Sequence, residues 1–183
     1  MLLSRHYFCF DSQAIDLAGV APISTTFNGT ATLRTTDSRA SGPFSMPISF
    51  GVFFFEGHGS VSLTDFPELV TAPFEVDTPF GRRTNVTVVR KTSGGDGLFN
   101  KPSGGFAIPV SLFLDHSLDF PFVEEDSSLS IVLQTGAAGG VMGVPLDRAT
   151  GKLTLVGVGR LVDGILDGAT GTVILDGSLA TVP

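Results

Sequence analysis

The stretch Leu146–Gly157, LDRATGKLTLVG, recurs 20 residues further along the chain at Leu166–Gly177 as LDGATGTVILDG. Both copies place a polar Asp-x-Ala-Thr-Gly segment between apolar residues. This composition is typical of the turn at which one strand passes to the next in a β-hairpin. We therefore predict an antiparallel β-meander in the C-terminal half. We interpret the Asp, Thr and Gly residues of the repeat as turn residues, with glycine after threonine at positive φ, and not as a catalytic motif.

Alternation of apolar and polar residues extends the strand pattern over most of the chain. Phe106, Ile108, Val110 and Leu112, for example, fall on one face of an extended segment. Helix signals are poor, with room for a turn or two only at 12–19. Strands are predicted near 25–36, 45–55, 59–66, 82–91, 104–115, 128–135, 151–161 and 171–180, with shorter candidates near 96–100 and 162–167.

This number of strands in 183 residues favours a single all-β domain over residues 1–183. We predict an antiparallel β-barrel of about eight strands that ends in the C-terminal meander. The alternative is a two-sheet β-sandwich, because both architectures hide the strand edges that a flat sheet would expose.

Composition limits the classes of function. A net charge of −7 with 11 basic residues argues against a nucleic-acid partner, because phosphate binding needs a field of Lys and Arg. The single cysteine, Cys9, cannot form an internal disulfide or a paired-thiolate metal site, and we expect no metal or other cofactor. No apolar window is long enough to span a membrane, so we expect a soluble, cytoplasmic protein. The Asn28 and Asn85 sequons would accept glycans only in a eukaryotic secretory protein.

Phenylalanine is concentrated in the first two thirds of the chain, where all 16 residues lie at or before Phe122. Three of them, Phe53-Phe54-Phe55, are consecutive, so both faces of that strand must be covered or one must meet a ligand. One hypothesis is that the N-terminal segment covers the second face. The other is an apolar cavity that binds a hydrophobic small molecule and is lined by Phe50, Phe53, Phe55 and Phe113.

The chain has three histidines, so acid–base chemistry by imidazole near neutral pH must use one of them. Asp115 and His116 follow the strongest predicted strand, and Glu56 stands beside His58 on a glycine-flanked turn. The candidate catalytic residues are therefore Asp115, His116 and Glu56. Asp115 and His116 cannot simply pair with each other, because neighbours in an extended chain point to opposite faces.

The segment GVGRLVDG at Gly157–Gly164, followed by DGATGTV at Asp167–Val173, resembles the closing strands of allene oxide cyclase-like and dirigent-like barrels. In those proteins a glycine-rich strand precedes a Gly-Ala-Thr-Gly turn. The resemblance implies an eight-stranded antiparallel barrel with an apolar cavity that binds or cyclises a hydrophobic molecule. Only turn positions match, so it places no catalytic residue in this chain.

Three hypotheses for the function remain. The first is binding of a hydrophobic small molecule in the barrel cavity, as the mean hydropathy of +0.34 suggests. The second is a cofactor-independent cyclase or isomerase that acts on a hydrophobic substrate in the same cavity. The third is a structural or assembly domain, for which a symmetric homo-oligomer with phenylalanine at the contact would be the sign.

Overall fold

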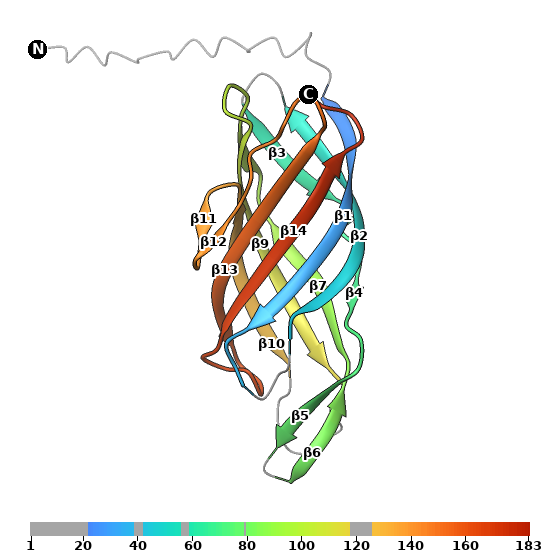
Figure 1. Ribbon diagram of the computed structural model, residues 1–183, viewed down its shortest axis with the longest axis vertical. Helices are drawn as coiled ribbons and strands as arrows, with labels where there is room; N and C mark the ends of the chain where they lie inside the picture. Colours follow the sequence, from blue (N-terminus) through green and yellow to red (C-terminus); the bar gives the residue numbers. More distant parts are fainter. Residues whose placement is uncertain (1–21, 39–41, 56–58, 79, 118–125) are drawn as a thin grey trace, which may run out of the picture.

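The structure, a computed structural model, describes residues 22–38, 42–55, 59–78, 80–117 and 126–183. The regular secondary structure in these residues consists of β-strands, joined by turns and loops. Eight antiparallel strands close into a ring in which the last strand pairs with the first (Figure 1). The predicted antiparallel barrel of about eight strands is confirmed. In ring order its strands are β1 (Ile23–Thr35), β2 (Phe44–Phe55), β3 (Ser60–Thr64), β8 (Gly97–Asn100), β9 (Gly105–His116), β10 (Ser127–Gln134), β13 (Lys152–Val162) and β14 (Thr170–Leu179).

Two further strands lengthen the wall toward the lower end of the barrel in Figure 1. β7 (Thr87–Gly94) pairs with β9 on the same edge as β8, with a register shift between Lys91 and Ser93. β4 (Leu69–Val70) pairs with β7 and continues the register that β3 sets with β8. The barrel wall therefore contains two long, interrupted strands. One is formed by β3 and β4, and the other by β7 and β8.

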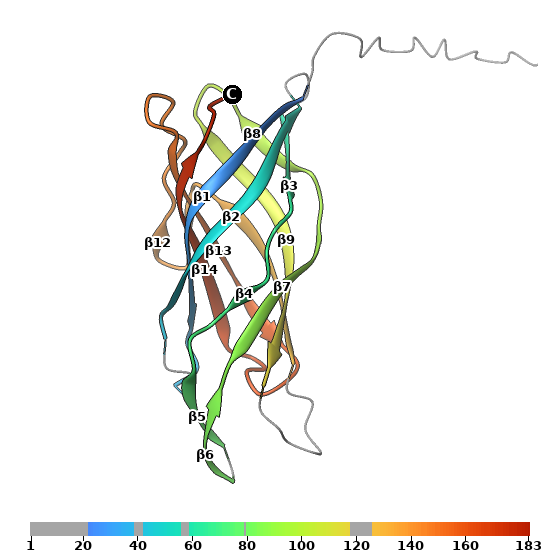
Figure 2. The same ribbon diagram turned by 90° about the vertical axis from the view of Figure 1, so that its right-hand side faces the viewer.

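Two small hairpins lie outside the ring. β5 (Phe74–Thr78) and β6 (Gly81–Asn85) form a hairpin that extends below the barrel (Figure 2). Its two strands are linked by an exposed ion pair, in which Arg82 Nε lies 3.1 Å from Asp77 Oδ1. β11 (Ala137–Ala138) and β12 (Val141–Met142) form the second hairpin, on the outer wall near β13.

Some sequence predictions need correction. The segment predicted as one strand at 82–91 is two, because the chain leaves the ladder at Val86, whose N–H and carbonyl both bond to Ser117. The candidate strand at 162–167 is a turn beyond Val162, where Asp163 and Gly164 take positive φ values of 66° and 64°. The weak helix candidate at 12–19 lies outside the described residues.

The two copies of the sequence repeat form different turns. In the first copy, Gly151 has the positive φ, and the carboxylate of Asp147 accepts hydrogen bonds from Thr150 Oγ1 and Ala149 N, which lower the pKa of Asp147. In the second copy, Gly168 has the positive φ, and Gly171 already lies in β14. The turn prediction is confirmed, but the expectation of positive φ after threonine holds only for Gly151.

Inward side chains from the ring strands form one apolar core. On β2 the inward residues are every second one from Met46 to Phe54, as the alternation of burial shows. The upper part is filled by aromatic contacts, such as Phe27 on Phe50 with ring centroids 4.8 Å apart and Phe54 on Phe99 at 4.9 Å. Phenylalanine thus fills the part of the barrel above the site described below.

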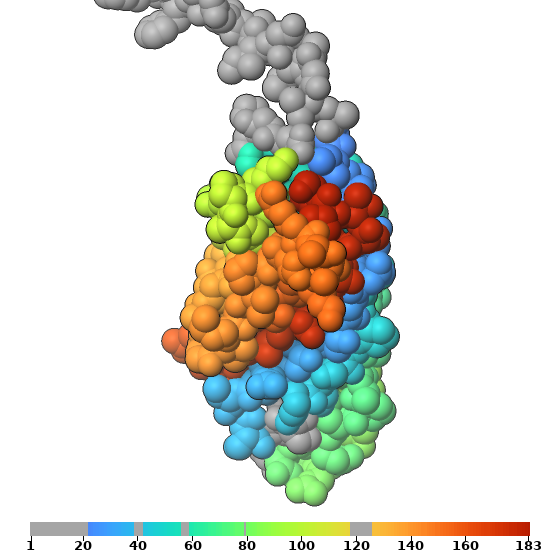
Figure 3. All heavy atoms as spheres, turned by 45° about the horizontal axis from the view of Figure 1, so that its top comes forward, coloured from blue at the N-terminus to red at the C-terminus, as the bar shows by residue number. Residues whose placement is uncertain are grey.

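The upper end of the barrel is tied together by loops. Arg148 donates to the carbonyl of Lys101, and Leu146 N donates to Gly104 O at 2.9 Å. Figure 3 shows these yellow-green and orange segments lying beside the red C-terminal residues at that end. In the part of the chain that the structure describes, no helix has the length and apolar character needed to cross a membrane.

Candidate functional site

An apolar cavity of about 50 Å³ lies inside the lower end of the barrel. The Phe44 ring packs on the Phe74 ring at one side of it, with centroids 4.4 Å apart. Phe74 belongs to the hairpin outside the ring, so one wall of the cavity comes from an element that pairs with no strand of the barrel. The main apolar wall residues are Leu33, Phe44, Phe74, Val89, Leu112, Leu114, Leu129, Leu161, Leu166 and Val173.

His116 brings an imidazole to this apolar cavity. It is the last residue of β9 and shares the inward face of that strand with Leu112 and Leu114, as the alternation of burial predicts. Its exposed fraction is 5%. The sequence prediction of His116 as a candidate site residue therefore falls on a side chain that lines the cavity.

Two side chains bond to the Nδ1 edge of the ring, and a third holds the backbone of one of them. Thr87 Oγ1 lies 2.8 Å from His116 Nδ1, and Asn85 Nδ2 lies 3.0 Å from Thr87 Oγ1 and 3.4 Å from Nδ1. Thr71 Oγ1 accepts the backbone N–H of Thr87 at 3.0 Å and so fixes the strand that carries the hydroxyl. All four residues are buried.

The other ring nitrogen is different. His116 Nε2 is buried and has no hydrogen-bond partner among the described residues, a state shared only with Thr64 Oγ1, which does not line the cavity. An unpaired buried polar group costs about 1–3 kcal/mol. Burial lowers the pKa of His116, against smaller opposing effects of Asp126 and Asp115. The ring is therefore neutral near pH 7 and presents one unsatisfied polar atom.

Asp115, the second candidate catalytic residue that the structure describes, does not join His116. Asp115 points to the outer face, where its carboxylate lies 3.2 Å from Arg90 Nη1, and Arg90 also pairs with Glu68 at 2.8 Å. The strand alternation that carries His116 inward carries Asp115 outward. Glu56 lies outside the described residues.

The four phenylalanines expected at a cavity do not share one face. Phe50 is inward in the packed upper core, whereas Phe55 is 41% exposed. Phe53 and Phe113 are half-buried at outward positions of β2 and β9. Phe53 lies three positions after Phe50, and an odd offset in a strand puts two side chains on opposite faces.

Sequence reasoning missed Asn85 and Thr87 as site residues. Their signal was the two-residue spacing of Asn85, Thr87 and Val89, which puts all three on one face of an extended segment. The sequence Asn85-Val86-Thr87 matched a glycosylation sequon instead. Asn85 is 0% exposed, however, and its amide donates a hydrogen bond to Thr87 Oγ1. A buried hydrogen-bonded amide is not available to a glycan.

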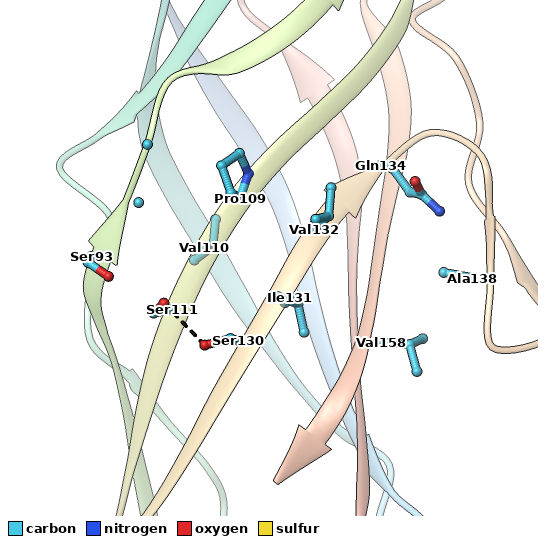
Figure 4. Close-up of a pocket in the computed structure, with 12 residues that line it drawn as sticks. Ser93, Pro109, Val110, Ser111, Ser130, Ile131, Val132, Gln134, Ala138 and Val158 are labelled. Carbon is cyan, nitrogen blue, oxygen red and sulfur yellow. Dashed lines mark hydrogen bonds between the residues drawn. The ribbon is translucent and has the colours of Figure 1, made fainter. Parts of the chain in front are cut away.

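A second hollow, of about 740 Å³, lies open on the outer wall (Figure 4). Its floor includes Ser111 and Ser130, whose hydroxyl oxygens are 3.3 Å apart, and Val132 and Val158 stand beside it. Among the described residues no ionisable side chain lines this hollow. The cavity with the imidazole is therefore the stronger candidate for chemistry or specific binding.

Neither a metal centre nor a known relative points to a further site among the described residues. Within the described ranges, no group of three or more His, Cys, Asp or Glu residues is placed to hold a metal ion. Comparison with protein-family models, with curated proteins and with solved structures finds no match for this chain. The likeness of its C-terminal turns to allene oxide cyclase-like and dirigent-like barrels stays a prediction.

Proposed function

We propose that this chain binds a small hydrophobic molecule in the cavity at the lower end of the barrel. The observation that carries the proposal is the buried imidazole of His116, whose Nε2 has no hydrogen-bond partner among the described residues, in the lining of a cavity formed mainly by apolar side chains together with Arg34 and four threonines. Ligand sites commonly combine apolar walls with a few placed polar groups that fix orientation. A bound molecule would cover the apolar surface and give Nε2 a partner.

The position of Asp115 favours binding over catalysis. A cyclase or isomerase that used Asp115 with His116 would need both groups in one cavity. Asp115 instead forms an ion pair with Arg90 on the outer face. We therefore rank the cyclase or isomerase hypothesis second, and the assembly hypothesis third.

The size of the cavity predicts how a ligand enters. A cavity of about 150 Å³ holds a molecule the size of benzene, whereas this one measures about 50 Å³. A ligand with six heavy atoms therefore requires a wall to move. Phe74 is the wall residue best suited to move, because β5 is paired only with β6 among the described strands.

The test measures binding of methylenecyclopentane, a hydrocarbon with six heavy atoms, by NMR titration of the leucine methyl groups. We expect the wild-type protein to bind it and Phe74→Ala to bind it about tenfold tighter, because the variant no longer has to displace a ring. Phe80→Ala, a matched change in the same hairpin but 70% exposed, should leave the dissociation constant unchanged.

Two further variants locate the site. Leu114→Phe adds volume to the cavity wall and should abolish binding, whereas Val132→Phe changes the outer hollow and should not. Binding that is lost in Val132→Phe and kept in Leu114→Phe would place the ligand on the outer wall. Either that result, or no binding to wild type and Phe74→Ala, would refute the proposal.

A further inference from the structure

The hydrogen bonds around His116 determine which ring nitrogen carries the proton. The amide nitrogen of Asn85 can only donate, and it lies 3.0 Å from Thr87 Oγ1. The orientation of this amide is supported by its oxygen, which accepts from Ser117 Oγ at 3.5 Å. Ser117 has its proton free for that bond, because its oxygen accepts from Val86 N at 2.9 Å.

Thr87 then has one proton and one suitable acceptor. Its hydroxyl oxygen accepts from Asn85, and its own hydrogen points to the remaining close neighbour, His116 Nδ1, at 2.8 Å. The Asn85 amide also lies on the same side of the ring, 3.4 Å from Nδ1. Nδ1 is thus an acceptor for two donors, and a neutral imidazole with Nδ1 as acceptor carries its hydrogen on Nε2.

Nε2–H is therefore a donor without a partner among the described residues, on a side chain that lines a mainly apolar cavity. We infer that the ligand is a neutral carbonyl compound, an aldehyde, ketone or ester, whose oxygen accepts a hydrogen bond from His116 Nε2–H. This inference rests on the proposed binding function and adds the chemical class of the ligand. A carbonyl oxygen is an acceptor alone, so a single donor in an apolar cavity satisfies it.

Other oxygen groups fit this cavity less well. An alcohol could accept from Nε2–H, but its own hydrogen would then also need an acceptor in walls that are mainly apolar. A carboxylate would carry a charge into mainly apolar walls beside a neutral imidazole, and Arg34, the cation among the described lining residues, is itself exposed to solvent. A hydrocarbon would offer Nε2–H no acceptor.

The test compares cyclopentanone with methylenecyclopentane, which has the same shape with a methylene group in place of the oxygen. The measured quantity is the ratio of the two dissociation constants in each protein, because the hydration of the probes is then the same and cancels. We expect the ratio to shift about tenfold toward the hydrocarbon in His116→Phe relative to wild type. Cyclopentanol should bind less tightly than cyclopentanone to wild type.

The tautomer itself is measured without a ligand, by long-range ¹H–¹⁵N NMR of the histidine ring in the wild-type protein. We expect the hydrogen on Nε2. Thr87→Val removes the donor to Nδ1 and should both populate the other tautomer and reduce the preference for the ketone. Thr32→Val is the matched control, since the Thr32 hydroxyl bonds to Ser45 on the outer face at 3.0 Å.

The outcomes separate this inference from the proposed function. A proton found on Nδ1, or a probe ratio that His116→Phe does not change, overturns the carbonyl inference while hydrocarbon binding still stands. The absence of binding by either probe, in wild type and in Phe74→Ala, refutes the proposed function itself. If His116→Phe does not fold, the wild-type tautomer and the Thr87→Val ratio decide.

Discussion

At the scale of single residues, the two ring nitrogens of His116 lie in opposite environments. Its backbone ends a regular strand, which directs the side chain inward, and its Nδ1 edge is fully hydrogen-bonded. Its Nε2 edge is buried without a partner among the described residues. A buried polar atom without a partner costs stability, and proteins depart from such local rules mainly at functional or strained sites.

The pH dependence of stability should report this burial. The pKa of His116 is lowered in the folded protein, mainly by desolvation, so between that value and about 6.5 the unfolded chain binds more protons. The contribution of His116 to the free energy of unfolding is therefore fully present above about pH 6.5, and it is lost as the pH falls through the lowered pKa. Urea unfolding of wild type and His116→Gln from pH 8 to 5 measures it.

The variant separates the effect of His116 from that of the other ionisable groups in the chain. We expect the free energy of unfolding of wild type to fall more steeply on acidification than that of His116→Gln, by about 1.4 kcal/mol for each unit by which the pKa values differ. Equal slopes for the two proteins would show that the His116 ring is not desolvated.

At the scale of elements, the close approach of β1 and β14 depends on glycine. Gly29 and Gly177 are directly paired across the two strands. A Cβ atom on Gly177 would lie 2.3 Å from the carbonyl oxygen of Asn28 and 2.7 Å from the ring of Phe27. The backbone cannot give way there without opening the ladder that closes the ring.

Gly177→Ala should therefore lower the free energy of unfolding by about 1–3 kcal/mol, the usual cost of overpacking. Gly136→Ala is the control, because the atoms nearest to its added Cβ are side-chain atoms of Gln134 at 3.9 Å. Chemical denaturation followed by far-UV circular dichroism measures both. A loss for Gly177→Ala no larger than that for the control would mean that the two strands can separate at little cost.

The sequence predicted the regular strands well, because apolar residues recur at every second position, as from Phe106 to Leu114 and at Val173 and Leu175. The strand predicted at 82–91 covers most of β6, whose Arg82, Arg83 and Thr84 are polar and exposed, but β5 and therefore the hairpin were not predicted. For the site, His116 could be proposed because histidine is scarce. Thr87 could not be placed beside it, since that contact depends on the register of β7 with β9, and a shift between Lys91 and Ser93 interrupts that register.

At the scale of the whole molecule, one apolar core connects both ends of the barrel. The same cluster of buried side chains includes Phe54 in the upper aromatic region and Leu161 at the cavity. Strands of 10 to 13 residues such as β1, β2, β9 and β14 run between these regions. The barrel should therefore unfold as a single cooperative unit.

Calorimetry should show one transition, with equal van't Hoff and calorimetric enthalpies. Phe54→Ala and Leu161→Ala, at the two ends, should each shift that same transition, with losses of about 3–5 and 2–5 kcal/mol. Phe55→Ala, next to Phe54 but 41% exposed, should change stability by only about 0.5 kcal/mol. Two separable transitions in either core variant would show that the ends fold independently.

The pairing of β1 with β14 also determines when the barrel can close during synthesis. Just beyond β14, Ala180 N still donates to Thr26 O at 2.8 Å, so the seam joins segments from opposite ends of the described chain. At roughly 5–20 residues per second, β1 leaves the ribosome on the order of ten seconds before β14. Throughout that interval β1 and then β13 present open edges. We expect chaperones to engage the nascent chain at this seam, and two unfinished chains to pair with each other there.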